Sequence, residues 1–178
     1  DDLSSYRPIS NLTFLFKLLE RIIHNCLITH LNSFSSLAPF QSAYRKFHSV
    51  ETALLCIQND LLLSVDKRQV TALILLDLSA AFDTIDHNIL LTRLSSTFGI
   101  CGPALDLLTS YLTDRHQFVC IDSDSSDLAS LTTGVPQGSV LGPLLFTLYT
   151  TPLSYLLQNA AMSFHFYADD TQLYIPFS

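Results

Sequence analysis

The apolar residues in the first third of the chain recur with the period of an α-helix. Over residues 12–31 they stand three and four positions apart, and Ser10 or Asn11 is placed to cap the helix that this spacing predicts. A second amphipathic helix is predicted to begin at Ser49 and Glu51. The residues predicted to form its inner face are Leu54, Ile57, Leu61 and Val65.

Two further regions have the pattern of β-strands that end in acidic residues. Residues 70–76 form a continuous apolar run with β-branched members, which predicts a strand buried on both faces, and this run stops at Asp77. Residues 163–168 and 171–177 are strand-like and meet at the Asp-Asp pair 169–170. The second region therefore predicts a hairpin with two carboxylates at its tip.

The middle of the chain is predicted to contain two helices followed by a hairpin. The first helix begins at Asp83 or Thr84 and ends at Gly99, where a glycine lets the chain leave the helix. The second helix covers about residues 103–112. Residues 117–133 then predict a hairpin with a long, solvated polar turn.

A tight loop and one more helix lie between this hairpin and the acidic one. The loop covers residues 134–139, and Ser139 is placed to cap the helix that follows. Pro143 is tolerated because it lies near the first turn of that helix. The helix is predicted to end at residues 150–153.

The composition is that of a folded chain with a large apolar core. Of the 178 residues, 48% are apolar and 14% are charged, and the mean hydropathy is +0.34. These values exclude a disordered chain, and the length suits one domain or two small lobes that share a core. The net charge of −7 opposes a nucleic-acid-binding role unless carboxylates gather at a metal site and a basic surface lies elsewhere in the protein.

The termini and the cysteines add three expectations. The chain does not start with Met and its single Met is Met162, so an excerpt from a longer reading frame is expected. No apolar stretch reaches the roughly 18 residues of a spanning helix and no signal-peptide pattern is present, so an intracellular protein without a membrane partner is expected. The four cysteines form no CxxC pair, which predicts free thiols and no structural zinc.

Asp77, Asp169 and Asp170 are the residues with the clearest chemical potential. Neighbouring central strands would bring these carboxylates together, where their repulsion needs a cation to offset it. Carboxylate oxygens suit Mg²⁺, and two such ions can support an in-line displacement at phosphorus. The alternative is ordinary turn and cap chemistry, because Asp is common in hairpin turns and at strand ends.

Five blocks of sequence resemble, in this order, the successive blocks of the reverse transcriptases of non-LTR, LINE-type retrotransposons. The blocks are SYRPIS at 5–10, QSAYRK at 41–46, LDLSAAFD at 76–83, GVPQGSVLGP at 134–143 and YADD at 167–170. Together they span nearly the whole chain.

The resemblance implies an α+β fold of the right-hand polymerase type, with fingers and a partial palm but without a thumb. The palm of this family has a central antiparallel sheet with packed helices. Residues from 1 to about 69 would be fingers-like and those from about 70 to 178 palm-like, with a hairpin insertion at 115–133.

The resemblance also assigns roles to the acidic residues. Asp77, Asp169 and Asp170 would be the catalytic, metal-binding triad, and the main-chain oxygen of Leu78 would be a further metal ligand. The implied cofactor is Mg²⁺, as two ions, with Mn²⁺ as a substitute.

Four more residues match substrate-binding positions of the family. Arg45 would grip the triphosphate, Phe82 would lie under the sugar and exclude a 2′-hydroxyl, and Gln137 and Gly138 would pack against the incoming nucleotide and the template base. The alternatives are a solvated loop arginine for Arg45, core packing for Phe82, and a structural turn for the other two.

The implied function is that of an RNA-directed DNA polymerase core, which adds deoxynucleotides to a primer 3′ end. Its partners would be an RNA template, a DNA primer and deoxynucleoside triphosphates, and the parent protein would act in the nucleus and cytoplasm. Three alternatives stay open: an inactive retroelement-derived fragment, a group II intron or RNA-templated RNA polymerase, and an acidic binding module.

Overall fold

The contacts in the computed structural model divide the chain into two compact units. Unit 1 comprises Asp1–Leu27 and Phe82–Tyr149, and unit 2 comprises Ile28–Ala81 and Thr150–Ser178. This division cuts the chain elsewhere than the fingers-like and palm-like parts, which stay a prediction. In the described part of the chain, no helix has the length and apolar character needed to cross a membrane. The residues described are 9–34, 37–160 and 162–177.

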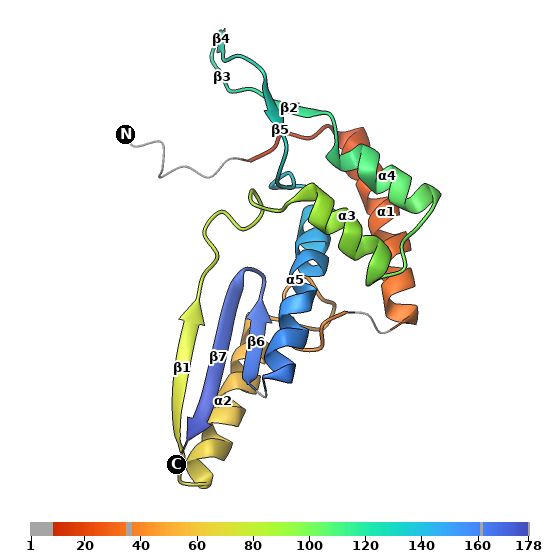
Figure 1. Cartoon of the computed structure of the whole chain (residues 1–178). Coiled ribbons are helices and arrows are strands. Elements are labelled where there is room, and N and C mark those ends of the chain that lie inside the picture. Colours follow the sequence, from red (N-terminus) through yellow and green to blue (C-terminus); the bar gives the residue numbers. More distant parts are fainter. Residues whose placement is uncertain (1–8, 35–36, 161, 178) are drawn as a thin grey trace. The chain divides into compact units, whose positions relative to one another are not determined.

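Unit 2 is built on a three-stranded antiparallel sheet. Its strands are β1 (Val70–Leu76), β7 (Asp170–Phe177) and β6 (Ser163–Tyr167), in this spatial order (Figure 1). The strand predicted at residues 70–76 and the acidic hairpin are both confirmed. The central strand of the sheet is β7, which pairs with β1 on one side and with β6 on the other.

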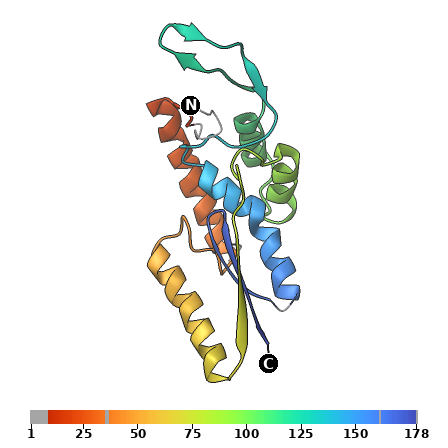
Figure 2. The same ribbon diagram turned by 90° about the vertical axis from the view of Figure 1, so that its left-hand side faces the viewer.

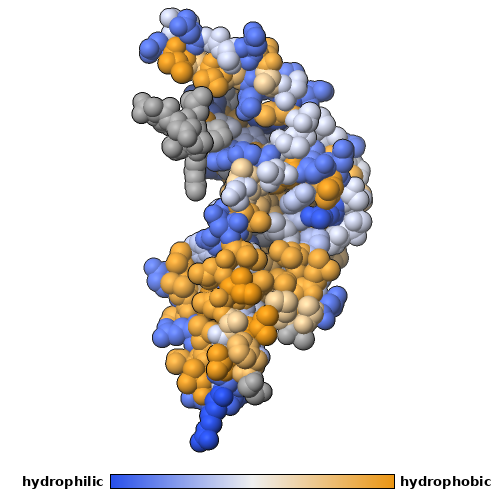
Figure 3. Space-filling model, turned by 60° about the vertical axis from the view of Figure 1, so that its left-hand side comes forward, coloured by the Kyte–Doolittle hydropathy of each residue, from blue (hydrophilic) through white to orange (hydrophobic). Residues whose placement is uncertain are grey.

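The prediction that β1 is buried on both faces is wrong. Five of its seven residues are exposed, and Leu75 is 69% exposed. Apolar side chains therefore cover much of the face that carries this strand (Figure 3). The reason is its place at the edge of the sheet, because an apolar run shows what a strand can bury and not which elements lie against it.

Helix α2 (Val50–Asp66) contacts β1 and β6 and lies along the sheet (Figure 2). Its predicted start is confirmed, since Ser49 forms a capping box with Thr52. The predicted inner face is confirmed at Ile57, which is buried with Ala53, and Leu61 is half-buried. Two members of that predicted face are exposed, Leu54 and Val65.

A polar contact explains which face of α2 lies toward the sheet. The hydroxyl of Tyr174 on β7 donates a hydrogen bond to Oδ2 of Asp60 at 2.6 Å. Burial raises the pKa of the Tyr174 phenol far above its usual value, and the bond to Asp60 acts in the same direction. The face of α2 that carries Asp60 is therefore drawn to the sheet, a constraint that apolar periodicity does not contain.

Helix α1 (Phe14–Ser33) begins later than its predicted cap. The side-chain oxygen of Thr13 accepts from the N–H of the third residue of the helix at 3.3 Å, so neither Ser10 nor Asn11 is the cap. The N–H of Ser10 instead donates to the main-chain oxygen of Gln137 at 2.9 Å. This long-range bond holds the chain outside the helix at that point.

Helix α3 (His87–Ser96) also starts later than predicted. Its N-cap is Asp86, whose carboxylate accepts from the N–H of Ile89 at 2.9 Å, in place of Asp83 or Thr84. The following helix, α4 (Pro103–Leu112), has the bounds that its pattern predicts. The delay of α3 has a tertiary cause, because the residues before it bond to a distant loop.

That loop is joined to the start of α3 by main-chain bonds within unit 1. The N–H of Gly134 donates to the oxygen of Ile85 at 2.8 Å, and the N–H of Val135 donates to that of Phe82 at 2.9 Å. Gly134 has a φ of +86°, and a Cβ added there would lie 2.9 Å from Cα and O of Asp83. Only glycine allows this close approach of two backbones.

A buried carboxylate braces the helices of unit 1. Glu20 on α1 is 1% exposed, and it accepts from the hydroxyl of Tyr111 on α4 at 2.7 Å and from the N–H of Val140 at 3.0 Å. Burial raises the pKa of the Tyr111 phenol, and the bond to Glu20 acts in the same direction. The brace joins α1, α4 and the entry to the next helix.

Helix α5 (Gly142–Asn159) runs from unit 1 into unit 2. The helix begins three residues after Ser139, the predicted cap, but the hydroxyl of Ser139 accepts from the N–H of Gly142 at 2.9 Å and so satisfies the first N–H of the helix. The predicted end at residues 150–153 is wrong, since α5 continues through Pro152. Its buried side chains, which include Leu148 and Ser154, outweigh the hydrogen bond lost at proline.

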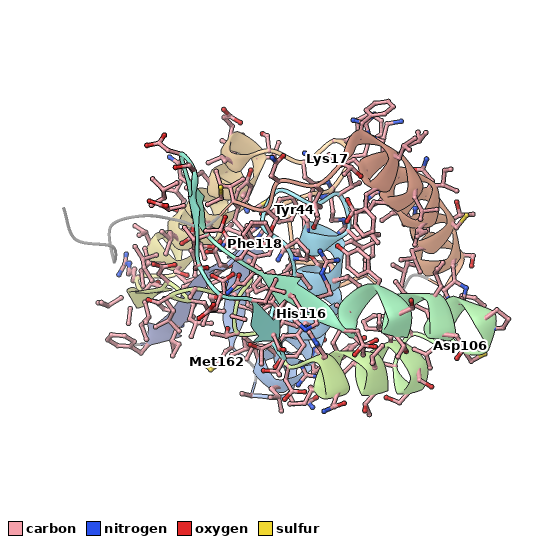
Figure 4. All side chains as sticks on the ribbon, turned by 90° about the horizontal axis from the view of Figure 1, so that it is seen from above. Lys17, Tyr44, Asp106, His116, Phe118 and Met162 are labelled. Atoms are coloured by element: carbon pink, nitrogen blue, oxygen red, sulfur yellow. The ribbon has the colours of Figure 1, made fainter. Side chains whose placement is uncertain are left out.

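The predicted hairpin of residues 117–133 is confirmed, with more order in its turn than expected. Strand β2 (Arg115–Gln117) pairs with β5 (Ala129–Leu131), and β3 (Cys120–Ile121) pairs with β4 (Asp124–Ser125). The region predicted as a long solvated turn therefore contains a second short ladder. Figure 4 labels His116 and Phe118 on this hairpin arm (residues 115–131), whose side chains are mostly exposed.

The hairpin strand β6 carries a buried histidine. His165 is 5% exposed, and its Nε2 shares a 2.8 Å hydrogen bond with the hydroxyl of Ser42. Burial lowers the pKa of His165; His48 lowers it further and Asp60 opposes this. Protonation of His165 is therefore less favourable in the folded chain than in the unfolded chain.

Replacement of Gly134 by Ala should destabilise the chain by about 2–4 kcal/mol, because the positive φ and the backbone contact both oppose a Cβ. The matched control is Gly99→Ala, where φ is +66° but no atom lies within 4 Å of the added Cβ, so a loss of about 1 kcal/mol is expected. Urea unfolding of the two variants measures the difference. Equal losses would contradict the close approach at Gly134.

The free energy of unfolding should fall as the pH drops below about 6.5, the usual pKa of an unfolded histidine. Between that value and the lowered pKa of folded His165, the unfolded chain binds more protons, so acid favours unfolding. Urea unfolding at a series of pH values measures this slope. His165→Gln should make the slope shallower, and an unchanged slope in that variant would exclude His165 as its source.

Candidate functional site

The acidic hairpin of unit 2 has a two-residue turn. Tyr167 pairs with Asp170 at the ends of β6 and β7, so Ala168 and Asp169 form the loop between them. Ala168 has a φ of +57°, a conformation that such turns require at their first position and that glycine normally supplies. Asp169 is half-buried and Asp170 is exposed.

The pairing of β1 with β7 brings the third carboxylate to the same end of the sheet. The register of this pair ends at Leu76 opposite Thr171, and Asp77 is the next residue along the chain. Asp77 therefore follows the last pair on the side of Asp170. Leu78, predicted as a main-chain ligand, comes directly after it and is 43% exposed.

The donor chemistry of these residues suits a divalent cation. All three side chains offer carboxylate oxygens, which are the ligands that Mg²⁺ and Mn²⁺ prefer. In the described residues, however, no three side chains of His, Cys, Asp or Glu lie close enough together to hold a metal ion. The register thus gathers the residues, while their side chains do not form a ligand cluster.

A residue with no role in the sequence prediction supports the acidic turn. Oε1 of Gln41 accepts from the N–H of Ala168 at 3.1 Å, and Nε2 of Gln41 donates to the oxygen of Ala168 at 3.3 Å. Gln41 is 2% exposed. It lies in the block at 41–46, but its partner is 127 positions away, and an amide side chain carries no signal of such a distant contact.

Tyr44, in the loop after Gln41, is affected by the charge of the acidic turn. The pKa of the Tyr44 phenol is raised by burial first, and then by the negative charge of Asp169 and by Tyr167. Tyr44 itself has a φ of +60°. The negative charge of Asp169 thus acts on Tyr44 in the loop that follows Gln41.

Arg45 is involved in the structure of its own loop. Its Nη1 donates to the main-chain oxygens of Ala38 at 3.1 Å, Pro39 at 3.4 Å and Gln41 at 3.3 Å. The alternative of a freely solvated side chain does not hold, because this nitrogen orders the chain between residues 38 and 45. Contact with a triphosphate stays a prediction for this residue.

The other predicted substrate residues belong to unit 1. The ring of Phe82 lies 5.0 Å from that of Phe146 between centroids, so it has packing contacts as the alternative reading requires. Nε2 of Gln137 donates to Oδ2 of Asp83 at 2.9 Å, a partner that was not predicted. Gly138 has a φ of +89°, which fits the predicted turn.

The fold of the chain is similar to that of solved telomerases. The apo telomerase of Candida tropicalis, truncated from the C-terminal domain, gives a TM-score of 0.62 at 19% identity, with 86% of this chain and 34% of that chain covered. Telomerase from Candida albicans, in complex with a TWJ fragment of telomeric RNA, gives 0.64 at 13% identity, with 90% and 30% covered. At these identities the likeness concerns the fold alone.

Curated proteins similar in sequence come from mobile elements of Drosophila melanogaster. The chain is 35% identical over 149 residues to a probable RNA-directed DNA polymerase from transposon BS, with 84% of this chain and 16% of the relative covered. It is 33% identical over 177 residues to the RNA-directed DNA polymerase from mobile element jockey, with 96% and 19% covered. The chain thus spans less than a fifth of the length of these relatives.

A family model described as reverse transcriptase (RNA-dependent DNA polymerase) matches residues 1–177, almost the whole chain. The relatives from mobile elements agree with the five sequence blocks, so the predicted resemblance to the non-LTR retrotransposon group is confirmed. This chain belongs to the reverse transcriptase family.

Proposed function

We propose that this chain is the core of an RNA-directed DNA polymerase that adds deoxynucleotides to a primer 3′ end. The observation that carries the proposal is the β1–β7 register, which leads Asp77 to the turn of Asp169 and Asp170 in a chain of this family. The proposed partners are an RNA template, a DNA primer and deoxynucleoside triphosphates.

In this proposal Asp77, Asp169 and Asp170 hold two Mg²⁺ ions, with the main-chain oxygen of Leu78 as a further ligand and Mn²⁺ as a substitute. The metal would favour ionisation of the primer 3′-hydroxyl and offset the charge of the leaving pyrophosphate. The carboxylates supply the negative charge; at the strand ends Asp77 and Asp170 are exposed and Asp169 is half-buried. Their side chains would turn together once a cation offsets their repulsion.

The substrate positions complete the proposal. Arg45 would contact the triphosphate with the part of its guanidinium that does not bond the loop. Phe82 would lie against the sugar, and Gln137 and Gly138 against the incoming nucleotide and the template base. The bond from Gln137 to Asp83 supports this role, because a fixed amide presents its remaining groups in one orientation.

A second candidate is a retroelement-derived fragment that folds but does not catalyse. The observations that favour it are the uncovered apolar residues of β1 and the absence of a three-ligand cluster in the described residues. Primer extension with the 178-residue chain beside a longer protein that contains it separates the two. Extension by the chain alone would exclude this candidate, and extension by the longer protein only would support it.

Asp169→Asn in a longer protein that contains this chain should lower Mg²⁺-dependent synthesis on an RNA template by roughly a hundredfold or more, because the amide binds a hard cation poorly. The matched control is Asp122→Asn on the exposed arm, which changes the net charge equally and should leave synthesis unchanged. Steady-state primer extension measures both. Full activity in Asp169→Asn would remove the metal assignment.

Phe82→Ala should lower the preference for deoxynucleotides over ribonucleotides by roughly tenfold or more, since the missing ring would leave room for the 2′-hydroxyl. The ratio of kcat/KM values for the two nucleotide types measures this preference. Because Phe82 also contacts Phe146, the control is Phe98→Ala, which removes a buried ring from the same unit. An unchanged ratio in Phe82→Ala, or an equal change in the control, would contradict the proposed exclusion of the 2′-hydroxyl by Phe82.

A further inference from the structure

One buried amide holds the peptide groups on both sides of Ala168. The N–H of Ala168 donates to Oε1 of Gln41 at 3.1 Å, and the oxygen of Ala168 accepts from Nε2 of Gln41 at 3.3 Å. Oε1 also accepts from the N–H of Ala43 at 3.0 Å. A single side chain thus satisfies both polar main-chain groups at the first position of the acidic turn.

The position of Gln41 is itself fixed by main-chain bonds. Its segment forms a parallel bridge with Phe166 on β6, in which the N–H of Ser42 donates to Phe166 at 3.0 Å and the N–H of Phe166 donates to Phe40 at 2.8 Å. The main-chain oxygen of Gln41 accepts from Nη1 of Arg45 at 3.3 Å. Both the backbone and the side chain of Gln41 are therefore tied to their surroundings.

The geometry of the turn explains how the hydrogen bonds from Gln41 can affect the direction of the Asp169 side chain. The oxygen of Ala168 belongs to the peptide that joins it to Asp169, so the bond from Gln41 fixes the plane of this peptide. That plane limits φ of Asp169 and hence the direction of its side chain. Ala168 has a φ of +57°, which costs a residue other than glycine of the order of 1–2 kcal/mol and favours release of the turn.

We propose that Gln41 is a positioning residue, which orients Asp169 through the Ala168 peptide and thereby sets the affinity of the acidic turn for a divalent cation. The part that concerns the cation rests on the proposed function, whereas the support of the turn does not. An amide is required because one oxygen must accept and one NH₂ must donate at the same time. Groups that hydrogen-bond a metal ligand directly typically change metal affinity by 10–100-fold when they are lost, and Gln41 acts on Asp169 through the adjoining peptide.

The support is tested by hydrogen exchange of the Ala168 amide in the isotope-labelled 178-residue chain, followed by NMR. Gln41→Met keeps an unbranched side chain of similar length without its polar groups, and it should speed this exchange roughly tenfold or more. The matched control is Ser42→Ala, which removes the neighbouring bond to His165 and leaves the Gln41 contacts in place. Equal exchange rates in Gln41→Met and the unaltered chain would overturn the support.

The effect on the site is tested by titration of the same chain with Mn²⁺, observed by the magnetic resonance signal of the free ion. Gln41→Met should weaken Mn²⁺ binding roughly tenfold or more, Ser42→Ala should leave it unchanged, and Asp169→Asn should abolish it. If Asp169→Asn abolishes binding but Gln41→Met binds like the unaltered chain, the inference falls and the proposed metal site stands. If Asp169→Asn binds normally, or the unaltered chain binds no Mn²⁺, both fall.

A second variant keeps the inference testable if Gln41→Met does not fold. Gln41→Glu retains the acceptor for Ala168 N–H but loses the donor to the Ala168 oxygen. If Gln41 acts by orienting Asp169, this variant should bind Mn²⁺ more weakly. The added negative charge alone would predict tighter binding. Tighter or unchanged binding in Gln41→Glu would overturn the role of orientation.

Discussion

The hydrogen-bond register between β1 and β7 is the constraint on which the candidate site depends. It ends with Leu76 opposite Thr171, so that Asp77 follows at the end of the sheet that carries the acidic turn. A slip of one residue would turn every side chain of β1 to the opposite face and move Asp77 away from its present level. The chemistry proposed for the carboxylates thus depends first on how the strands pair, because the pairing sets where Asp77 lies relative to the acidic turn.

Several contacts of unit 2 hold the acidic turn and the central strand β7, with which β1 pairs. The turn between β6 and β7 has only two residues, and Gln41 forms hydrogen bonds with both polar main-chain groups of Ala168 within it. The bond from Tyr174 to Asp60 ties the central strand to α2. A conformation that costs free energy at Ala168 is held by bonds from elsewhere in the unit, as is common at functional sites.

In unit 1, too, contacts between segments that are distant in sequence hold the loops in place. Glu20 accepts hydrogen bonds from two distant segments, and Gly134 brings its loop against the backbone at Asp83. The loop continues to Gln137, whose amide bonds the Asp83 carboxylate. Buried polar groups are costly unless they are paired, so each of these contacts selects one arrangement of its loop.

Local pattern determined much of this protein by itself. The period of apolar residues identified the helices, and the bounds of β1 and α4 agree with it because side-chain periodicity reflects backbone geometry directly. The five blocks identified the family. The acidic hairpin could also be predicted from the sequence, since strand-like runs on both sides of two Asp residues leave few other arrangements.

Tertiary structure alone decided burial, caps and the partners of polar groups. The exposure of β1 follows from its edge position, and the late start of α3 follows from bonds to the loop at Gly134. The roles of Gln41 and Asp83 come from contacts with residues far along the chain. The physical reason is that hydrogen bonds and burial depend on which segments meet in space, whereas periodicity and propensity describe each segment alone.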